Sequence, residues 1–166
     1  MFIETERLHI QAFTLQDAQL VMKNKSRFFL ENKINFTEGW PNYGLLAWLP
    51  LYVESLEADN QELGFGPWYM IERSSFTLVG DVGFKPVSIH KGQREISYSV
   101  VPSKRGKGYA QEAVSALTAW AFNHRISLVT AQCDQFNTPS LQVLKKCGYS
   151  VHGKEGTILL FKKERN

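Results

Sequence analysis

The sequence is poor in cysteine, and its cysteines stand in no recognisable pattern. Among 166 residues, Cys133 and Cys147 are the two that carry thiols. Their separation matches neither a metal-ligand motif nor the cysteine framework of a small secreted domain. The histidines show no metal-ligand spacing either. We therefore expect no metal, and two buried, reduced cysteines in a protein of the cytoplasm.

Long apolar runs and a strong charge of one sign are also missing. The longest apolar run, Leu45 to Leu51, is interrupted by Pro50 and is far shorter than a bilayer requires. Charged residues interrupt the apolar start of the chain, so we expect no signal peptide. The net charge of +3 is too small to indicate nucleic acid. These features predict a cytoplasmic protein with neither a membrane nor a nucleic-acid partner.

The rest of the composition is that of an ordinary globular protein, 43% apolar and 21% charged. The length predicts a single domain over residues 1–166. Strand-like patterns occur near 7–13, 67–73, 76–85, 93–101, 126–133 and 157–163, and helical patterns near 15–22, 108–123 and 139–146. A less regular region at 27–52 leads into a further helix that ends before Gly64. Hairpin-linked strands followed by a strand–helix–strand unit predict an α/β (α+β) fold with one central mixed sheet.

A basic loop with two glycines joins a predicted strand to a predicted helix. Gly106 and Gly108 let the backbone approach a ligand, and the helix start offers unpaired N–H groups with partial positive charge. Together they predict a binding site for phosphate or pyrophosphate. Tyr109 excludes a P-loop, and Gln111 removes the third glycine of a dinucleotide-binding fingerprint. A plain strand-to-helix turn without a ligand stays open.

The segment Arg105-Gly106-Lys107-Gly108-Tyr109-Ala110 resembles the Arg/Gln-x-x-Gly-x-Gly/Ala signature of the GNAT superfamily, the acetyl-CoA-dependent N-acetyltransferases. The resemblance extends along most of the chain. Thr5-Glu6-Arg7-Leu8 looks like the first strand of the branch typified by ribosomal-protein amino-terminal acetyltransferases. Further segments similar to that branch, in the same order, are Glu95-Ile96-Ser97-Tyr98, Asn137-Thr138-Pro139-Ser140 and Cys147-Gly148-Tyr149.

The resemblance implies a GNAT fold, with a mixed, mostly antiparallel sheet of six to seven strands flanked by about four helices. The strand before the loop would splay from its neighbour, and backbone groups at Val100 and Val101 would pair with the pantetheine arm of acetyl-CoA. Asn137 would cap the short helix and approach the pantetheine. The residues that would hold or neutralise the pyrophosphate are Arg105, Gly106, Lys107, Gly108, Tyr109 and Ala110. The implied partners are acetyl-CoA and an amine acceptor, bound by a monomer or homodimer.

The implied chemistry is acyl transfer from a thioester to a primary amine, which must be neutral to attack. Glu95 matches the glutamate that serves as base in histone-acetyltransferase relatives, and strand alternation places it on one face with Ser97 and Ser99. Ser140 matches the serine assigned as proton donor to the thiolate in the ribosomal branch. Leu144 stands where many relatives have a tyrosine. A structural carboxylate at Glu95 and a simple helix-start hydroxyl at Ser140 stay open.

The acceptor side is less defined by the sequence. Seven aromatic residues between Phe28 and Tyr52 form either the wall of an acceptor pocket or the packing of helices on the sheet. A peptide α-amine and a small-molecule amine are both compatible with the resemblance. Because the usual tyrosine is missing, a non-catalytic acetyl-CoA-binding sensor is the alternative to an enzyme.

Overall fold

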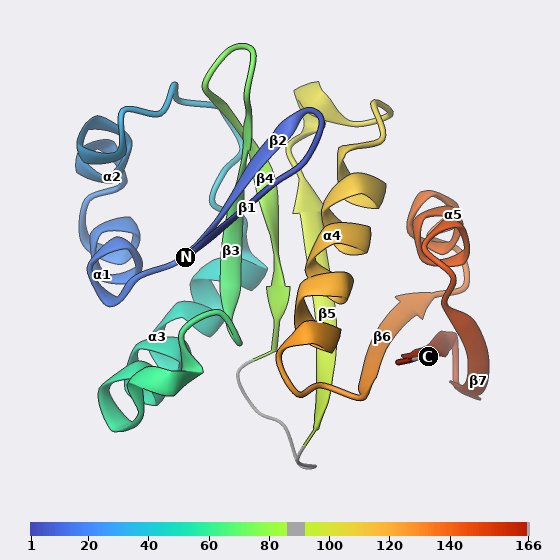
Figure 1. Ribbon diagram of the computed structural model, residues 1–166. Helices are drawn as coiled ribbons and strands as arrows, with labels where there is room; N and C mark the ends of the chain where they lie inside the picture. The colour runs from blue at the N-terminus through green and yellow to red at the C-terminus, as the bar shows by residue number, and fades with distance from the viewer. Residues whose placement is uncertain (86–91, 166) are drawn as a thin grey trace.

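The computed structural model describes residues 1–85 and 92–165, and one sheet runs through them (Figure 1). The strands are β1 (Phe2–Glu4), β2 (Leu8–Ala12), β3 (Pro67–Glu72), β4 (Thr77–Phe84), β5 (Gln93–Val100), β6 (Leu128–Asp134), β7 (Ser150–Glu155) and β8 (Ile158–Glu164). The helices are α1 (Leu15–Lys23), α2 (Lys25–Asn32), α3 (Tyr43–Ala58), α4 (Tyr109–Asn123) and α5 (Thr138–Lys146). Two short 3₁₀ turns lie at Asn60–Glu62 and Pro102–Lys104. Over the described ranges, no helix combines the length and apolarity needed to cross a membrane.

The strands are arranged in the order β1-β2-β3-β4-β5-β6-β8-β7. Every neighbouring pair is antiparallel except β5 and β6, which are parallel. This confirms the expected mixed, mostly antiparallel sheet. The described chain has eight strands and five α-helices, which corrects the expected six to seven strands and about four helices.

The additional elements have weak sequence patterns. Strand β1 is three residues long, and β7 is exposed along most of its length, so neither shows a clear apolar alternation. Helix α2 falls in the region expected to be irregular and is eight residues long. Its N-terminus is capped by Asn24, whose side chain accepts a hydrogen bond from the Arg27 N–H. Such short elements form because tertiary packing outweighs their weak local signal.

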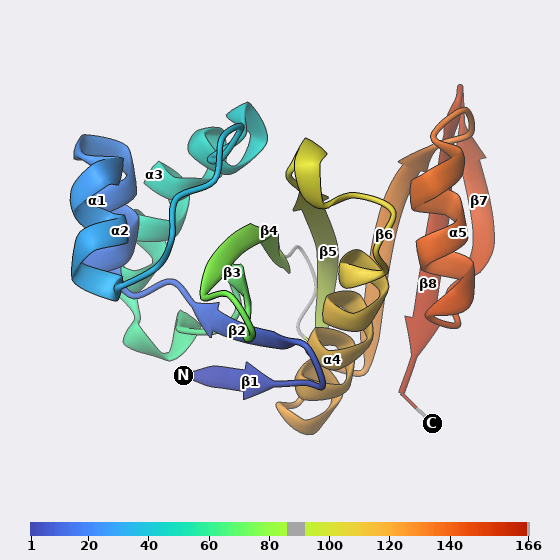
Figure 2. The same cartoon turned by 90° about the horizontal axis from the view of Figure 1, so that it is seen from above.

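Helices cover both faces of the sheet, and each face has its own apolar core. Figure 2 shows α1, α2 and α3 grouped on one side, with α4 and α5 on the other. The core beneath α4 is built on one apolar stripe of the helix, whose fully buried members are Ala113, Val114, Leu117 and Ala121. The core on the α1–α3 side includes Phe13, Phe28, Trp40, Leu49 and Tyr69. Both cysteines are buried and unpaired, as expected.

The sheet opens between β5 and β6. Among the described residues, these strands pair over 93–95 and 128–130, although both continue beyond that point. Strand β6 then follows β8 to Asp134, whereas β5 follows β4 to Val100. The result is the wedge between two strands that the family resemblance implies. The wedge is the opening beyond the Glu95–Thr130 pair.

Candidate active site

The open edge of β5 presents backbone groups to the wedge. At one end Lys85 donates its N–H to the Glu95 carbonyl at 2.9 Å, and at the other Val101 donates to the Val79 carbonyl at 3.0 Å. Because successive residues of a strand direct their backbone groups to opposite sides, the positions between these two alternate between β4 and the wedge. The residues whose N–H and C=O groups point away from β4, toward β6 and the wedge, are Ile96, Tyr98 and Val100.

Val101 does not offer the backbone groups expected of it. Its N–H bonds to Val79, and its carbonyl accepts from the Lys104 N–H at 2.9 Å. It belongs to the series of β5 positions that bond to β4, which is why the expectation fails for this residue. The Val100 carbonyl accepts a hydrogen bond from Arg105 Nε at 2.9 Å. The open edge therefore ends at Val100, and the Arg105 side chain closes it.

The loop after β5 presents a row of backbone N–H groups. Gly106 and Gly108 have φ values of +74° and +82°, a conformation that favours glycine. Gly108 is the N-cap residue of α4 and supplies no side-chain cap. In the part of the chain that the structure describes, no protein acceptor bonds to the N–H groups of residues 106–111. These donors are what an anionic group at a helix start requires.

One carboxylate joins both ends of this loop to β3. Arg105 and Lys107 are exposed, whereas Lys104 Nζ lies 2.8 Å from Glu72 Oε2. Glu72 also accepts a hydrogen bond from the hydroxyl of Tyr109, the first residue of α4. The Tyr109 side chain is buried, so only its backbone can serve a ligand at the loop. Glu72 thereby fixes Lys104 and Tyr109, the two residues that flank the loop.

A second carboxylate ties the loop to the start of the chain. Arg7 Nη2 lies 2.6 Å from Glu112 Oε2 in the first turn of α4, and Arg7 Nη1 donates to the Lys107 carbonyl at 2.7 Å. The Thr5 hydroxyl donates to Glu112 Oε1 at 2.6 Å. Thr5 and Arg7 therefore brace the loop. Sequence reasoning missed this role because the partners are 100 to 107 positions apart.

A cleft of about 410 Å³ lies at the wedge, between β5, β6 and α5. Asn137 caps α5, since its Oδ1 accepts from the Ser140 N–H at 3.2 Å. The Ser140 hydroxyl lies 2.8 Å from the Tyr98 hydroxyl. Burial raises the pKa of Tyr98 to about 12, so its phenol stays protonated at neutral pH. Leu144 is buried in the core, and the phenol beside the cleft comes from β5 instead.

Glu95 lines the same cleft from the opposite face of β5. Its Oε1 forms an ion pair with Lys85 Nζ. The Lys85 ammonium also lies 5.7 Å from the centre of the Trp48 ring on α3. The two expected catalytic residues, Glu95 on β5 and Ser140 on α5, therefore line one cleft.

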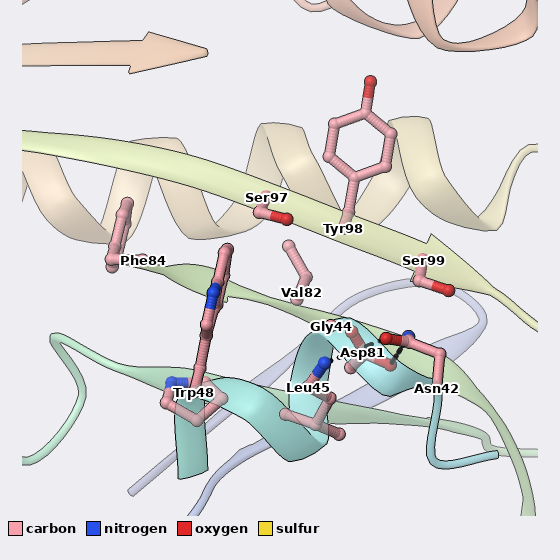
Figure 3. Close-up of a pocket in the computed structure, with 12 residues that line it drawn as sticks. Asn42, Gly44, Leu45, Trp48, Asp81, Val82, Phe84, Ser97, Tyr98 and Ser99 are labelled. Carbon is pink, nitrogen blue, oxygen red and sulfur yellow. Dashed lines mark hydrogen bonds between the residues drawn. The ribbon is translucent and has the colours of Figure 1, made fainter. Parts of the chain in front are cut away.

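A smaller cavity of about 200 Å³ lies on the α3 face of β4 and β5 (Figure 3). It adjoins the cleft, because Trp48 and Ser97 line both. Its carboxylate is Asp81, whose Oδ2 accepts hydrogen bonds from Trp40 Nε1 at 3.1 Å and Asn42 Nδ2 at 3.2 Å. Sequence reasoning missed Asp81. In the sequence, the only local sign of its role is that it is a charged residue in the middle of an apolar strand, which the structure shows to be otherwise largely buried.

The aromatic-rich segment divides between core and cavity. Four of its rings are buried in the core on the α1–α3 side, those of Phe28, Phe29, Trp40 and Tyr52. Phe36 and Tyr43 are exposed. Trp48 is half-buried and lines both the cavity and the cleft. Most of the segment therefore packs helices on the sheet, and Trp48 forms a wall of the cavity.

Residues 7–150 match the family model described as the acetyltransferase (GNAT) domain. The match covers most of the chain and includes the wedge, the loop and α5. The chain therefore belongs to the GNAT acetyltransferase family, whose donor is acetyl-CoA.

Similar proteins agree with this assignment. A curated relative, the "Uncharacterized N-acetyltransferase YjdG" of Bacillus subtilis strain 168, is 28% identical over 155 residues, which is 93% of this chain and 92% of the relative. A GNAT-family acetyltransferase from Bacillus anthracis has 24% identity and a TM-score of 0.66, covering 99% of this chain and 98% of its own. A ribosomal-protein-S5-alanine acetyltransferase from Vibrio fischeri has 18% identity and a TM-score of 0.69, with coverage of 99% and 96%. The two structures share the fold with this chain.

We expect the substitution Glu72→Gln to destabilise the protein in a pH-dependent way. Hydrogen bonds from Lys104, Ser75 and Tyr109 lower the pKa of Glu72 to about 2. A lowered pKa stabilises the folded state above the unfolded value of about 4.3, and the contribution is lost as pH falls toward the folded value. The variant should lose roughly 1–3 kcal/mol of unfolding free energy at neutral pH, and less with each step below pH ~4.

Urea unfolding of the wild type and the variant between pH 3 and 7 measures this difference. Glu57→Gln, which removes an exposed carboxylate of α3, should change stability little and serves as the control. A destabilisation by Glu72→Gln that stays constant over the whole pH range would contradict the interpretation.

Proposed function

We propose that this protein transfers the acetyl group of acetyl-CoA to a primary amine, by direct attack of the amine on the thioester carbon. The observation that carries the proposal is the open edge of β5, which leads directly to the row of free N–H groups at 106–111. An extended pantetheine arm can add to that edge as a strand, and a pyrophosphate can accept from those N–H groups. The residues proposed to bind acetyl-CoA are Val100, Arg105, Gly106, Lys107, Gly108, Tyr109 (through its backbone), Ala110 and Asn137.

The two faces of β5 suggest separate paths for the acceptor and the leaving group. Ser97 and Ser99 line the cavity under α3, whereas the Tyr98 ring points to the other side of the strand (Figure 3). A thioester held along the β5 edge would meet an amine from the α3 side. Its sulfur would then lie toward α5. This separation keeps the proton acceptor and the proton donor apart, as the reaction requires.

Glu95 is the proposed proton acceptor, in agreement with the family resemblance. Its Oε1 is engaged by Lys85, and its Oε2 has no bonded partner among the described residues. A chain of water molecules would carry the proton from the nitrogen to Oε2, because Glu95 lies at the closed end of the wedge, four residues along β5 from Ser99 beside the cavity. Loss of this proton leaves the amine lone pair free for attack.

Ser140 is the proposed proton donor to the leaving thiolate, with Tyr98 behind it. The two hydroxyls are 2.8 Å apart, which allows the phenol to replace the proton that the serine gives up. The Ser140–Tyr98 pair supplies a hydroxyl near the thiolate. Residue 144, where many relatives have a tyrosine, is leucine in this chain. The acceptor, by branch resemblance, is a peptide α-amine or a small-molecule amine. A cytoplasmic location and a monomeric or homodimeric state stay predictions.

Acetyl-CoA should stabilise the protein and be consumed in the presence of a suitable amine. At about 100 times its dissociation constant the donor adds about 2.7 kcal/mol, which raises the melting temperature by roughly 5–10 °C for a chain of this size. NAD and ATP are the control ligands. Stabilisation by either of them but not by acetyl-CoA would refute the donor assignment. Thiol release and mass spectrometry of products across an amine panel then test turnover, and binding without turnover would favour the sensor.

Substituting Glu95→Gln should reduce the acetylation rate by about 100-fold below the pKa of the amine, and by less above it. The reason is that a base matters most when the amine is protonated. The pH profile of kcat/KM for both proteins is the measurement. Glu62→Gln, which breaks a comparable ion pair with Arg94 outside the cleft, is the matched control. If both profiles have the same shape, Glu95 is not the base.

Removing either hydroxyl of the Ser140–Tyr98 pair should lower kcat by about tenfold, and removing both should cost little more, because the two act as one unit. Thiol release by Ser140→Ala, Tyr98→Phe and the double variant tests this. Tyr149→Phe is the control, since the Tyr149 hydroxyl bonds to Thr118 in the core, 2.6 Å away. Additive losses, or a loss as large in the control, would argue against the pair.

A further inference from the structure

We propose that the Asp81 carboxylate is the docking site for the acceptor, and that the acceptor is a compact primary ammonium compound with a short apolar body. This inference rests on the proposed function and adds the substrate class. Neither family membership nor the sequence motifs assign Asp81 a role.

Asp81 is held in a fixed orientation with one oxygen left over. Both hydrogen bonds from the protein, from Trp40 Nε1 and Asn42 Nδ2, end on Oδ2. Asn42 is itself fixed, since its Oδ1 caps α3 by accepting from the Leu45 N–H at 2.9 Å. Oδ1 of Asp81 has no hydrogen-bond partner in residues 1–85 and 92–165, and it is open to solvent, because no buried side-chain oxygen of those residues lacks a partner. Asp81 lines the cavity, so this oxygen is the one available to a ligand (Figure 3).

The carboxylate also lacks a countercharge. No lysine, arginine or histidine of the described chain forms an ion pair with Asp81. Burial raises its pKa to about 7, although the hydrogen bonds from Trp40 and Asn42 act in the other direction. A half-buried carboxylate without a countercharge gains most from a partner that brings a positive charge and an N–H donor together. A primary ammonium group provides both.

The other walls of the cavity limit the size and polarity of the part of the acceptor beyond its ammonium group. They are largely apolar, formed by Leu45, Trp48, Pro67, Val82 and Phe84. The volume of about 200 Å³ is below the roughly 300–1,000 Å³ of sites for drug-sized ligands. Asp81 is the one carboxylate among the residues that line it. A polyamine would leave its further charges unpaired, so a compact monoamine fits best.

The position of Asp81 suits an amine that reacts at the wedge. Asp81 lies opposite Ser99 in the β4–β5 register, and β5 is the strand that borders the wedge. An ammonium group has three N–H bonds. One can be donated to Asp81 Oδ1 while a second proton passes along a chain of water molecules to Glu95, which frees the lone pair. Asp81 thus holds the nitrogen and Glu95 accepts the proton, so the two carboxylates have different tasks.

Benzylamine and benzyl alcohol test this proposal, because they have nearly the same shape and differ in charge. Isothermal titration at pH 8 with saturating coenzyme A, which prevents turnover, gives both dissociation constants. The wild type should bind benzylamine at least about tenfold more tightly than the alcohol, and Asp81→Asn should reduce this preference to about twofold or less. In turnover, the variant should raise KM for benzylamine more than it lowers kcat, the reverse of Glu95→Gln.

Asparagine keeps an oxygen for Trp40 and Asn42, so Asp81→Asn should fold. Asp59→Asn, which removes an exposed carboxylate at the other end of α3, should retain the preference. Equal binding of the two probes to the wild type overturns the proposal without any variant, as does binding of neither, or tighter binding of spermidine or an alanine-initiated peptide. Failure of acetyl-CoA to bind would instead refute the proposed function, so the two outcomes are distinguishable.

Discussion

The early end of the β5–β6 pairing is the constraint on which the rest of the site depends. Two parallel strands that separate inside a sheet leave backbone N–H and C=O groups without partners, and such groups are costly unless something bonds to them. Here Arg105 supplies a partner for the Val100 carbonyl at one end of the opening. Beyond the last β5–β6 pair, the Ile96 carbonyl and the backbone groups of Tyr98 face the wedge. A ligand with its own amide groups is the kind of partner that this edge fits.

The loop beyond the wedge keeps its shape through contacts with distant parts of the chain. Glycine at 106 and 108 permits the backbone conformation but does not impose it. The order comes from Glu72 on β3, which holds Lys104 and Tyr109, and from Arg7, which bonds to the loop and to Glu112. A preformed row of donors loses less entropy on binding an anion than a flexible one. The β1–β2 turn and strand β3 therefore contribute to the proposed donor site by holding the loop in place.

Sequence reasoning located the features that have a local signal. The strand before the loop, the two glycines and the helix after them all follow from spacing and residue type, and each is present in the structure. The pairing of Tyr98 with Ser140 and the bonds of Trp40 and Asn42 to Asp81 join residues 39 to 42 positions apart. The strand register brings these side chains together, and no local pattern predicts that register. Val101 shows the same limit, because a one-residue difference in register decided which backbone groups were free.

The alternation of β5 explains how one strand can serve several parts of the proposed reaction. Residues 95, 97 and 99 direct their side chains to the α3 side and their backbone groups to β4, which leaves Ser97 and Ser99 beside the cavity. Residues 96, 98 and 100 do the opposite, so their backbone groups face the wedge and Tyr98 reaches Ser140 on α5. A shift of β5 by one residue would exchange the two sets and abolish the site, although the sheet itself could still form. The bonds at both ends of the strand, Lys85 to Glu95 and Val101 to Val79, oppose such a shift. The register of β5 is therefore a functional requirement as well as a structural one.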